Sequence, residues 1–244
     1  TPGGRLTATR QQAEAAADQV PGSKLSARLY EPFLWLGEKT GFRRWRQKVV
    51  SGVSGSVLEL GAGTGLNLVH YPAGLDRLVL VEPDFHKAGI LATKPAPAGV
   101  EPEIVRAPGE MLPFEDDTFD TVVETLVLCT VADPEATAAE IRRVLKPDGR
   151  FLFMEHVRSE GPRLGPLQDR MEKTWMRIAD GCHCNRRTVP MLEANGFEVE
   201  VTAEQDKFPM PPVARPIVSG IARPIAGSPP APERGSAPDG DAAT

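Results

Sequence analysis

The chain has 244 residues and a formal net charge of −5, with 41% hydrophobic and 25% charged residues, which is the composition of an ordinary globular domain. Its 23 glycines and 24 prolines have no fixed period, which excludes a collagen-like repeat. The acidic total argues against nucleic acid as a partner, because phosphate contacts require a basic surface.

The apolar runs of the sequence are short, and we therefore expect no membrane-spanning segment and no signal peptide in it. No stretch approaches the roughly 18 to 20 apolar residues needed to cross a bilayer, and residues 1–22 lack the apolar part of a signal peptide. The three cysteines, Cys129, Cys182 and Cys184, are too few for a disulfide framework and are typical of a reducing compartment. We expect a cytoplasmic monomer or homodimer with no transmembrane segment and at most a peripheral membrane contact.

The first 50 residues differ from the rest in charge and pattern. Residues 1–24 are small and polar, so we expect a flexible N-terminal segment. Residues 25–50 carry apolar side chains at helical spacing, which predicts one or two helices forming a lid. Residues 42–48, Phe-Arg-Arg-Trp-Arg-Gln-Lys, are interpreted as a solvated basic helix face with Trp45 packed inward, and contact with an anionic membrane or a polar substrate is the alternative.

From residue 56 onward, short apolar runs alternate with helical segments. The runs predict strands at residues 57–60, 78–81, 103–105, 119–123 and 151–154, followed by 197–202 and 213–222. Helices are expected at 133–146, with Asp133 as N-cap, at 164–179 and at 188–195. This order predicts a parallel sheet covered on both faces, within one domain at 25–224. Residues 225–244 are expected to form a disordered Pro/Gly-rich tail.

A glycine-rich loop follows the first predicted strand, and an acidic residue ends the second. The loop is Gly61-Ala62-Gly63-Thr64-Gly65, and Glu82 lies 21 residues after Gly61. Glycines let the backbone approach a ligand, a helix expected after the loop offers free N–H groups, and the acid can accept hydrogen bonds from ribose hydroxyls. The arrangement predicts a nucleoside-cofactor site.

The details disfavour a dinucleotide as that cofactor. Leu66 stands where the dinucleotide fingerprint needs a third glycine. Glu59 places a carboxylate beside the loop, which repels phosphate and favours a cation such as an ammonium or sulfonium. An NAD-type oxidoreductase, the rival enzyme class, is further disfavoured because neither tyrosine is followed by lysine at Tyr-x-x-x-Lys spacing. A non-catalytic cofactor-binding module stays open, since no acceptor-side residue is obligatory.

Four segments resemble class I S-adenosylmethionine-dependent methyltransferases: VLELGAGTG at 57–65, VEPD at 81–84, GEMLPFEDDTFD at 109–120 and IRRVLKPDGR at 141–150. The resemblance extends over about residues 30–224. It implies an α/β fold with a Rossmann-like, seven-stranded, mostly parallel sheet of order 3-2-1-4-5-7-6 and helices on both faces. It also implies S-adenosyl-L-methionine as methyl donor and S-adenosyl-L-homocysteine as product.

The same resemblance implies a set of cofactor-binding residues. Glu59 and the glycine loop would line the methionine part, Glu82 would hold the ribose, and Gly109 and Glu110 would lie by the adenine. The whole set is Tyr30, Glu59, Gly61, Ala62, Gly63, Thr64, Gly65, Glu82, Pro83, Gly109, Glu110, Met111, Thr125 and Leu126. Pro108 stands where many relatives carry an Asp for the adenine amino group, and a solvated loop carboxylate is the alternative for Glu110.

The acceptor side carries a narrower resemblance. The segments FMEHV at 153–157 and DGC-x-x-x-R at 180–186 are similar to animal thiol S-methyltransferases and their bacterial relatives, although quinone-biosynthesis and phospholipid N-methyltransferases share much of the pattern. The resemblance implies methyl transfer to a small, apolar acceptor, with a thiol as first choice. Oxygen or nitrogen acceptors, including quinone-type and lipid ones, are the alternatives.

Two residues are candidates for catalysis, His156 and Asp180. Methyl transfer depends mainly on alignment, but a thiol acceptor benefits from conversion to thiolate. His156 follows the strand at 151–154 and is the candidate base, with a loop-fixing histidine as the alternative and Glu155 as another polar partner. Asp180 is the fallback base, and by resemblance it would shape the acceptor pocket with Cys182. No metal is expected, since the Cys-His-Cys spacing at 182–184 differs from ordinary zinc motifs. Cys129 is interpreted as a small buried hydrophobe.

Overall fold

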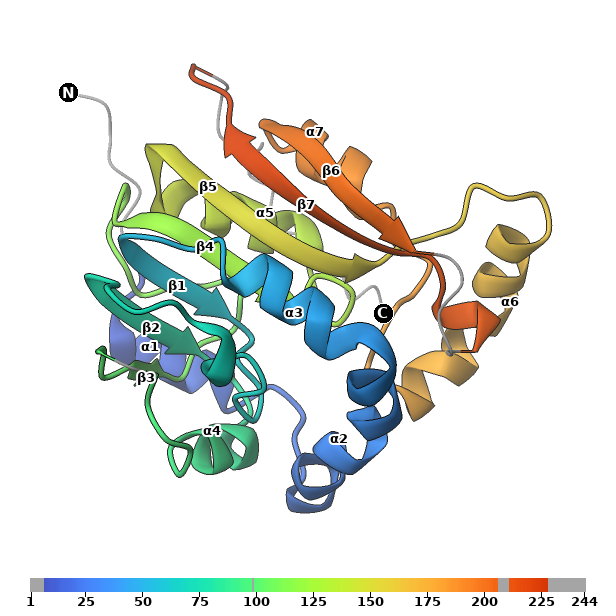
Figure 1. The fold of residues 1–244 in the computed structure, drawn as a ribbon, viewed down its shortest axis with the longest axis horizontal. Helices are drawn as coiled ribbons and strands as arrows, with labels where there is room; N and C mark the ends of the chain where they lie inside the picture. Colours follow the sequence, from blue (N-terminus) through green and yellow to red (C-terminus); the bar gives the residue numbers. More distant parts are fainter. Residues whose placement is uncertain (1–6, 98, 206–210, 228–244) are drawn as a thin grey trace, which may run out of the picture.

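A seven-stranded sheet forms the middle layer of the computed structural model, which describes residues 7–97, 99–205 and 211–227 (Figure 1). The strands are β1 (Ser56–Leu60), β2 (Arg77–Val81), β3 (Glu103–Val105), β4 (Phe119–Thr125), β5 (Leu145–His156), β6 (Phe197–Gln205) and β7 (Ile217–Pro224). Their order is β3-β2-β1-β4-β5-β7-β6, and only β7 runs antiparallel to both of its neighbours. The predicted order, with the last strand inserted between the fifth and sixth, is confirmed.

The strands are apolar along their length because both faces of the sheet are covered. Alternate residues of β1 belong to different hydrophobic clusters. Leu58 packs with Ile141 of helix α5 (Pro134–Val144) on one face. Val57 packs with Val50 of helix α3 (Arg43–Val50) on the other. Glu59 follows the same alternation and lies on the α3 face. Figure 1 shows α3 on one side of the sheet and α5 on the other.

The helices cover the sheet and its C-terminal edge. They are α1 (Arg10–Ala17), α2 (Lys24–Gly37), a π-helical turn (Glu38–Phe42), α3 (Arg43–Val50), α4 (Phe85–Leu91), α5 (Pro134–Val144), α6 (Leu164–Ile178) and α7 (Thr188–Ala194), with short 3₁₀ helices at Leu68–His70 and Pro212–Ala214. Asp133 caps α5 as predicted, accepting from the backbone N–H groups of Glu135 and Ala136 at 3.0 Å each. The expected helical region at 25–50 is present as α2, the π-helical turn and α3.

The N-terminal part differs from the expected flexible segment at 1–24. The Thr9 side chain accepts from the Gln12 backbone N–H, and the Gln12 side chain accepts from the Thr9 backbone N–H. This capping box starts α1. Ala13 is fully buried in the main hydrophobic cluster, and Arg10 pairs with Glu103 of β3 at 3.0 Å. This helix therefore packs against the β3 edge of the sheet. Residues 1–6 lie outside the described residues.

The C-terminal part differs in where the last strand begins. The sequence pattern predicts a start at Val213, but residues 212–214 form a 3₁₀ helix and β7 starts at Ile217. Pro211, Pro212 and Pro216 cannot donate to a strand ladder, which accounts for the late start. In the predicted tail at 225–244, residues 228–244 lie outside the described residues. Within the described part of the chain, no helix has the length and apolar character to span a membrane.

Candidate active site

The glycine loop lies at the C-terminal ends of the parallel strands, between β1 and the end of β2. Gly61, Gly63 and Gly65 have positive φ values of +61°, +58° and +89°. The Gly63 N–H donates to Glu82 Oε2 at 2.8 Å, and the Asp84 N–H donates to Glu82 Oε1 at 2.9 Å. Burial raises the pKa of Glu82, although these two N–H bonds and nearby Lys87 oppose the shift. Glu82 thus fixes the loop and keeps lone pairs for further donors.

The loop requires glycine for reasons of space as well as backbone angle. A Cβ atom on Gly61 would lie 2.6 Å from Val127 Cγ2, in the turn that follows β4. The α-helix expected after the loop is absent: the described chain there has only the 3₁₀ helix Leu68–His70. Tyr71 is extended because it precedes Pro72, which disfavours helical backbone at that position. Within the described residues, the loop is therefore not followed by an α-helix N-terminus that could offer free N–H groups.

A buried carboxyl adjoins the loop on the α3 face. Glu59 is 2% exposed, and it accepts from Asn67 Nδ2 at 2.7 Å and from the Tyr71 hydroxyl at 2.5 Å. Burial raises the pKa of Glu59 to about 7, and these hydrogen bonds and Arg46 act in the opposite direction. Near neutral pH the carboxyl is poised between its two forms, so a cationic ligand would favour ionisation.

The end of β4 lies beside Glu59 and the glycine loop. Thr125 Oγ1 accepts from Asn67 Nδ2 at 3.0 Å, which connects β4 to the segment after the glycine loop. Leu126 has φ of +66°, and its backbone N–H donates to the Met154 carbonyl oxygen at 2.7 Å. Glu59, the glycine loop, Glu82, Thr125 and Leu126 are thereby brought together at one edge of the sheet, where ligands bind in open α/β folds.

The residues predicted to lie by the adenine have contacts of their own. A Cβ on Gly109 would lie 2.9 Å from Thr137 Cγ2 of α5, so this glycine allows close packing. Glu110 Oε1 accepts from the Asp133 N–H at 3.0 Å, and Met111 is 36% exposed.

The other predicted cofactor-binding residues lie in the loop, after β2 and in α2. Ala62 and Thr64 are buried within the loop. The Pro83 carbonyl accepts from Arg106 at 3.1 Å. Tyr30 lies in α2, and its side chain is outside what the structure describes.

His156, the predicted base, ends β5 and is buried. Its Nδ1 lies 2.8 Å from the Ala214 carbonyl oxygen. Because a carbonyl can only accept, we assign the proton to Nδ1, which leaves Nε2 as the acceptor. Burial lowers the pKa of His156 to about 4. The ring meets Phe42 edge to face, with centroids 6.4 Å apart. The imidazole is therefore neutral at physiological pH.

Asp180, the fallback base, lies in the turn after α6 and is ion-paired. Its carboxylate lies 2.5 Å from Lys87 Nζ of α4 and accepts from the Ser26 hydroxyl of α2 at 3.1 Å. Partial burial acts to raise the pKa of Asp180, but the hydrogen bond and charge of Lys87 outweigh it and hold the pKa below its usual value. The contacts join α2, α4 and the turn.

The three cysteines lie in a small apolar cluster, which forms the candidate acceptor side. Cys129, Cys182 and Cys184 are free and buried, and they pack with Val213, against which Leu126, Met171, Trp175 and Ala179 are partly buried. The neighbouring Cys182 thiol and burial raise the pKa of Cys129 well above its usual value. Cys129 is thus a small buried hydrophobe, as predicted.

The turn at 180–186 is tied directly to the segment that follows β4. The His183 N–H donates to the Cys129 carbonyl at 2.7 Å. The Arg186 guanidinium donates to the carbonyl oxygens of Leu128 and Val131. These contacts place the cysteine cluster next to Leu126, so the candidate acceptor side adjoins the candidate cofactor side.

Two buried carboxyls were not singled out by the sequence analysis as a pair. Glu124 and Glu155 are fully buried at the ends of β4 and β5. Glu124 accepts from the Val127 N–H at 2.9 Å, and Glu155 accepts from the Cys129 N–H at 3.2 Å. Burial raises the pKa of Glu124 well above its usual value, and the adjacent Glu155 adds to this shift. The pair holds the turn that carries Leu126, and one shared proton relieves their repulsion.

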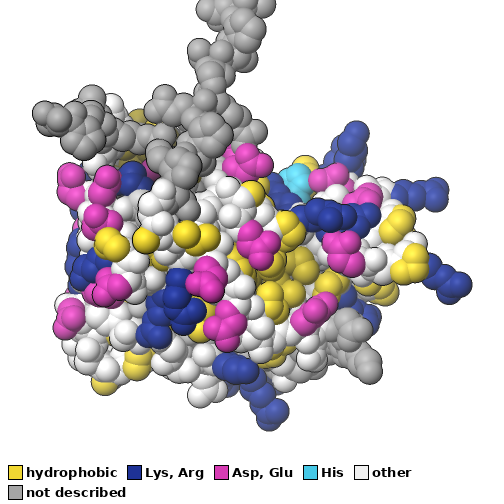
Figure 2. Space-filling view, turned by 90° about the horizontal axis from the view of Figure 1, so that it is seen from above, with side chains coloured by type: hydrophobic (Ala, Val, Ile, Leu, Met, Phe, Trp, Pro, Cys, Tyr) yellow, Lys and Arg dark blue, Asp and Glu magenta, His cyan; other side chains and the backbone are white. Residues whose placement is uncertain are grey.

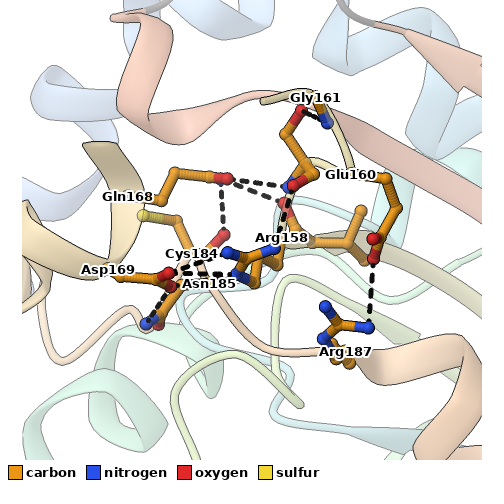
Figure 3. Close-up of polar contacts among 10 residues, drawn as sticks. Arg158, Glu160, Gly161, Gln168, Asp169, Cys184, Asn185 and Arg187 are labelled. Carbon is orange, nitrogen blue, oxygen red and sulfur yellow. Dashed lines mark hydrogen bonds and ion pairs between the residues drawn. The ribbon is translucent and has the colours of Figure 1, made fainter. Parts of the chain in front are cut away.

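Gln168 of α6 is another residue that the sequence analysis missed. It is fully buried, and its Oε1 accepts from the Ser159 N–H at 2.7 Å. Its Nε2 lies 2.8 to 3.2 Å from four carbonyl oxygens, those of Val157, Cys184, Val213 and Arg215. Figure 3 shows Gln168 beside the ion pair of Arg158 with Asp169, 2.8 Å apart. A glutamine in an otherwise amphipathic helix gives no sequence signal of this role.

Comparison with known proteins identifies the chain's relatives. A family model described as "Methyltransferase domain" matches residues 58–153. Human thiol S-methyltransferase TMT1B is 40% identical over 169 residues, which cover 67% of this chain and 68% of the human protein.

Solved structures agree on the fold. A structure from Thermotoga maritima, described as a SAM-dependent methyltransferase and possible histamine N-methyltransferase, matches with a TM-score of 0.59 at 19% identity, covering 81% of this chain and 97% of that one. A complex of DhpI with S-adenosylhomocysteine matches with a TM-score of 0.55 at 17% identity, covering 89% of this chain and 97% of that one. At these identities the likeness concerns the fold alone.

Proposed function

Because the chain belongs to the class I S-adenosylmethionine-dependent methyltransferases, we propose that it transfers a methyl group to the sulfur of a small, apolar thiol. In this reaction the thiol loses its proton, the sulfur forms a bond to the methyl carbon, and the donor's carbon–sulfur bond breaks to leave S-adenosylhomocysteine. S-adenosylmethionine supplies the activated methyl group. The chain's part is to align the two sulfur atoms and exclude competing nucleophiles.

One observation carries the choice of acceptor. The cluster of Cys129, Cys182 and Val213, with Met171 and Trp175 against it, adjoins Leu126 at the candidate cofactor edge. Its side chains are apolar or weakly polar, which suits an uncharged, polarisable sulfur compound better than a charged amine. The relative named thiol S-methyltransferase, 40% identical, supports the same choice.

The chain's residues fit the methyl donor. S-adenosylmethionine carries a sulfonium and an ammonium, and the buried carboxyls of Glu59 and Glu82 flank the loop that would receive them. We propose that Glu82 accepts from the ribose hydroxyls and that Glu59, the loop, Thr125 and Leu126 surround the methionine part. The roles of Tyr30, Pro83, Gly109, Glu110 and Met111 stay predictions.

We propose that His156 and Asp180 position groups and do not abstract the thiol proton. A histidine whose pKa is about 4 is a weak base, and a carboxylate paired with Lys87 is weaker still. His156 fixes the Ala214 loop through Nδ1, and Asp180 joins the turn at 180–186 to α2 and α4. The thiol then binds uncharged and loses its proton to solvent before the sulfur–carbon bond forms, so the thiolate is the reacting species.

The partner proposed here is a small-molecule methyl acceptor. The face seen in Figure 2 carries side chains of both charge signs around a group of hydrophobic ones, and the described residues visible there form no continuous basic band. The monomeric or homodimeric state and the cytoplasmic location expected from the sequence stay predictions.

A direct assay tests the proposed reaction. The protein is incubated with S-adenosylmethionine and a matched panel of one aliphatic thiol, one aromatic thiol, one phenol and one amine, and S-adenosylhomocysteine and the methylated product are quantified together. We expect turnover on the thiols and little on the other acceptors. Turnover confined to the phenol or amine contradicts the thiol assignment, and binding of the donor with no product on any acceptor supports a non-catalytic module.

A further inference from the structure

We propose that Arg46 of α3 binds the carboxylate of the methionine part of S-adenosylmethionine and so makes the site selective for a donor that carries it. The basic stretch at 42–48 was expected to form a solvated helix face, and Arg43 and Arg44 are indeed exposed. Arg46 is the exception, since it is only 3% exposed. A buried guanidinium needs an explanation, because a buried cation is costly unless its charge and donors are satisfied.

Arg46 donates hydrogen bonds to residues from three segments around the candidate cofactor site. Its Nη1 donates to Thr125 Oγ1 at 2.5 Å and lies 3.4 Å from Asn67 Oδ1. Its Nε donates to Glu38 Oε1 at 2.7 Å. Thr125 ends β4 and Asn67 follows the glycine loop, so the guanidinium lies where these two segments meet.

The remaining nitrogen of the guanidinium, Nη2, indicates where a ligand could bind. Arg46 Nη2 is buried and has no hydrogen-bond partner among the residues that the structure describes. A buried donor without an acceptor costs free energy, and a planar guanidinium is well suited to binding a carboxylate. The free donor and the burial indicate an oxygen acceptor at this point, and the guanidinium, which also pairs with Glu38 through Nε, favours a negatively charged one.

The neighbouring groups indicate which anion. Glu59 contacts Asn67, as Arg46 does, which places a carboxyl and a guanidinium at the two ends of one buried network. An amino-acid group carries an ammonium beside a carboxylate, and this pair matches Glu59 and Arg46 in sign and order. The inference concerns the methyl donor, so it stands or falls independently of the proposed thiol acceptor.

The experiment compares two donors that differ only in this carboxylate. Calorimetry measures the affinities of S-adenosylmethionine and decarboxylated S-adenosylmethionine for the wild-type protein and for Arg46→Met. We expect the wild type to prefer S-adenosylmethionine by about tenfold or more, as for one charge-assisted hydrogen bond, and Arg46→Met to bind the two donors about equally. Arg44→Met, an exposed change on the same helix, should keep the wild-type preference.

The ratio of the two affinities separates recognition from damage to the fold. If Arg46 only supports the loops, its loss lowers the affinity for both donors alike and leaves the ratio of the two affinities unchanged. That result overturns the proposal. A wild-type protein that binds both donors equally overturns it without any variant. Should Arg46→Met fail to fold, Arg46→Lys keeps the charge and loses the planar fork, and we expect it to retain only part of the preference. A full wild-type preference in Arg46→Lys counts against the guanidinium geometry.

Discussion

The backbone N–H of Gly63 donates a 2.8 Å hydrogen bond to Glu82 Oε2, so the carboxyl that ends β2 holds the loop that follows β1. The same carboxyl also accepts from Asp84 at the start of α4. One buried side chain therefore links the loop to the end of the neighbouring strand, so we expect a change of this carboxyl to disturb the candidate cofactor site.

Replacing Glu82 by Gln should weaken cofactor binding by about 10- to 100-fold, because one acceptor oxygen becomes an NH₂ group that opposes a backbone N–H of Gly63 or Asp84. Calorimetry with S-adenosylhomocysteine measures the effect. Glu200→Gln is the matched control: Glu200 is an exposed residue of β6 that pairs with Arg223, so its change should leave the affinity as it is. An equal loss in both variants would contradict the assignment of Glu82 to the cofactor.

Gly61→Val should lower cofactor affinity at least about tenfold and reduce the free energy of unfolding by about 2 kcal/mol. The added Cβ would lie 2.6 Å from Val127 Cγ2 at a residue with φ of +61°. Gly74→Val is the control, since Gly74 also has positive φ but no heavy atom lies within 4 Å of its Cβ position. Retained affinity in Gly61→Val, measured by calorimetry, would contradict the assignment of the loop to the cofactor.

The stability of the protein should depend on the protonation of Glu59. Its folded-state pKa of about 7 lies above the usual value of 4.5 for a glutamate, so the folded protein binds more protons than the unfolded chain between these pH values. The free energy of unfolding therefore falls as pH rises from about 4.5 to 7, by about 3 kcal/mol if Glu59 acts alone.

Urea unfolding of the wild type and Glu59→Gln across this pH range isolates the contribution of Glu59. The difference in stability between the two proteins should change with pH in that interval and level off above about pH 8. A difference that is constant from about pH 4 to about pH 8 would mean that Glu59 is not protonated at acidic pH in the folded state.

The pH dependence of kcat/KM should follow the pKa of the acceptor thiol and not the pKa of His156. With a thiol acceptor, kcat/KM should rise with pH and level off near the acceptor's own pKa, about 8.5 for a cysteine-like thiol. His156, with a pKa of about 4, should produce no inflection near its ordinary value of 6.5. His156→Asn should keep the profile, because its amide can still donate to Ala214 O. An inflection in that region that this variant loses would make His156 the base.

The sheet was predictable because its strands are buried on both faces and appear as continuous apolar runs. β1 to β4 begin within one residue of the prediction. The start of β5 at Leu145 was not predicted, because pairing of Leu145 with Phe119 of β4 extends it across a stretch that contains Pro147 and Gly149. Pairing between distant residues decides such boundaries, and a single sequence does not display it.

The candidate site was only partly predictable for a similar reason. Loop residues such as Gly63 carry a local pattern, so the motif was enough to find them. Arg46 lies in a basic run that is typical of a solvated surface, and its buried guanidinium donates to Thr125, 79 residues away in the sequence. Gln168 acts through four carbonyl oxygens from three separate segments. No local pattern can indicate partners of this kind.

The insertion of β7 between β5 and β6 has a consequence for how the chain assembles. During synthesis β6 emerges before β7, yet within the finished sheet it is joined to β5 only through β7. Until residues 217–224 have left the ribosome, the exposed edges of β5 and β6 lack their partner strand. Because long-range strand pairing forms slowly, we expect this half of the sheet to close late and its two open edges to be exposed to mispairing until then.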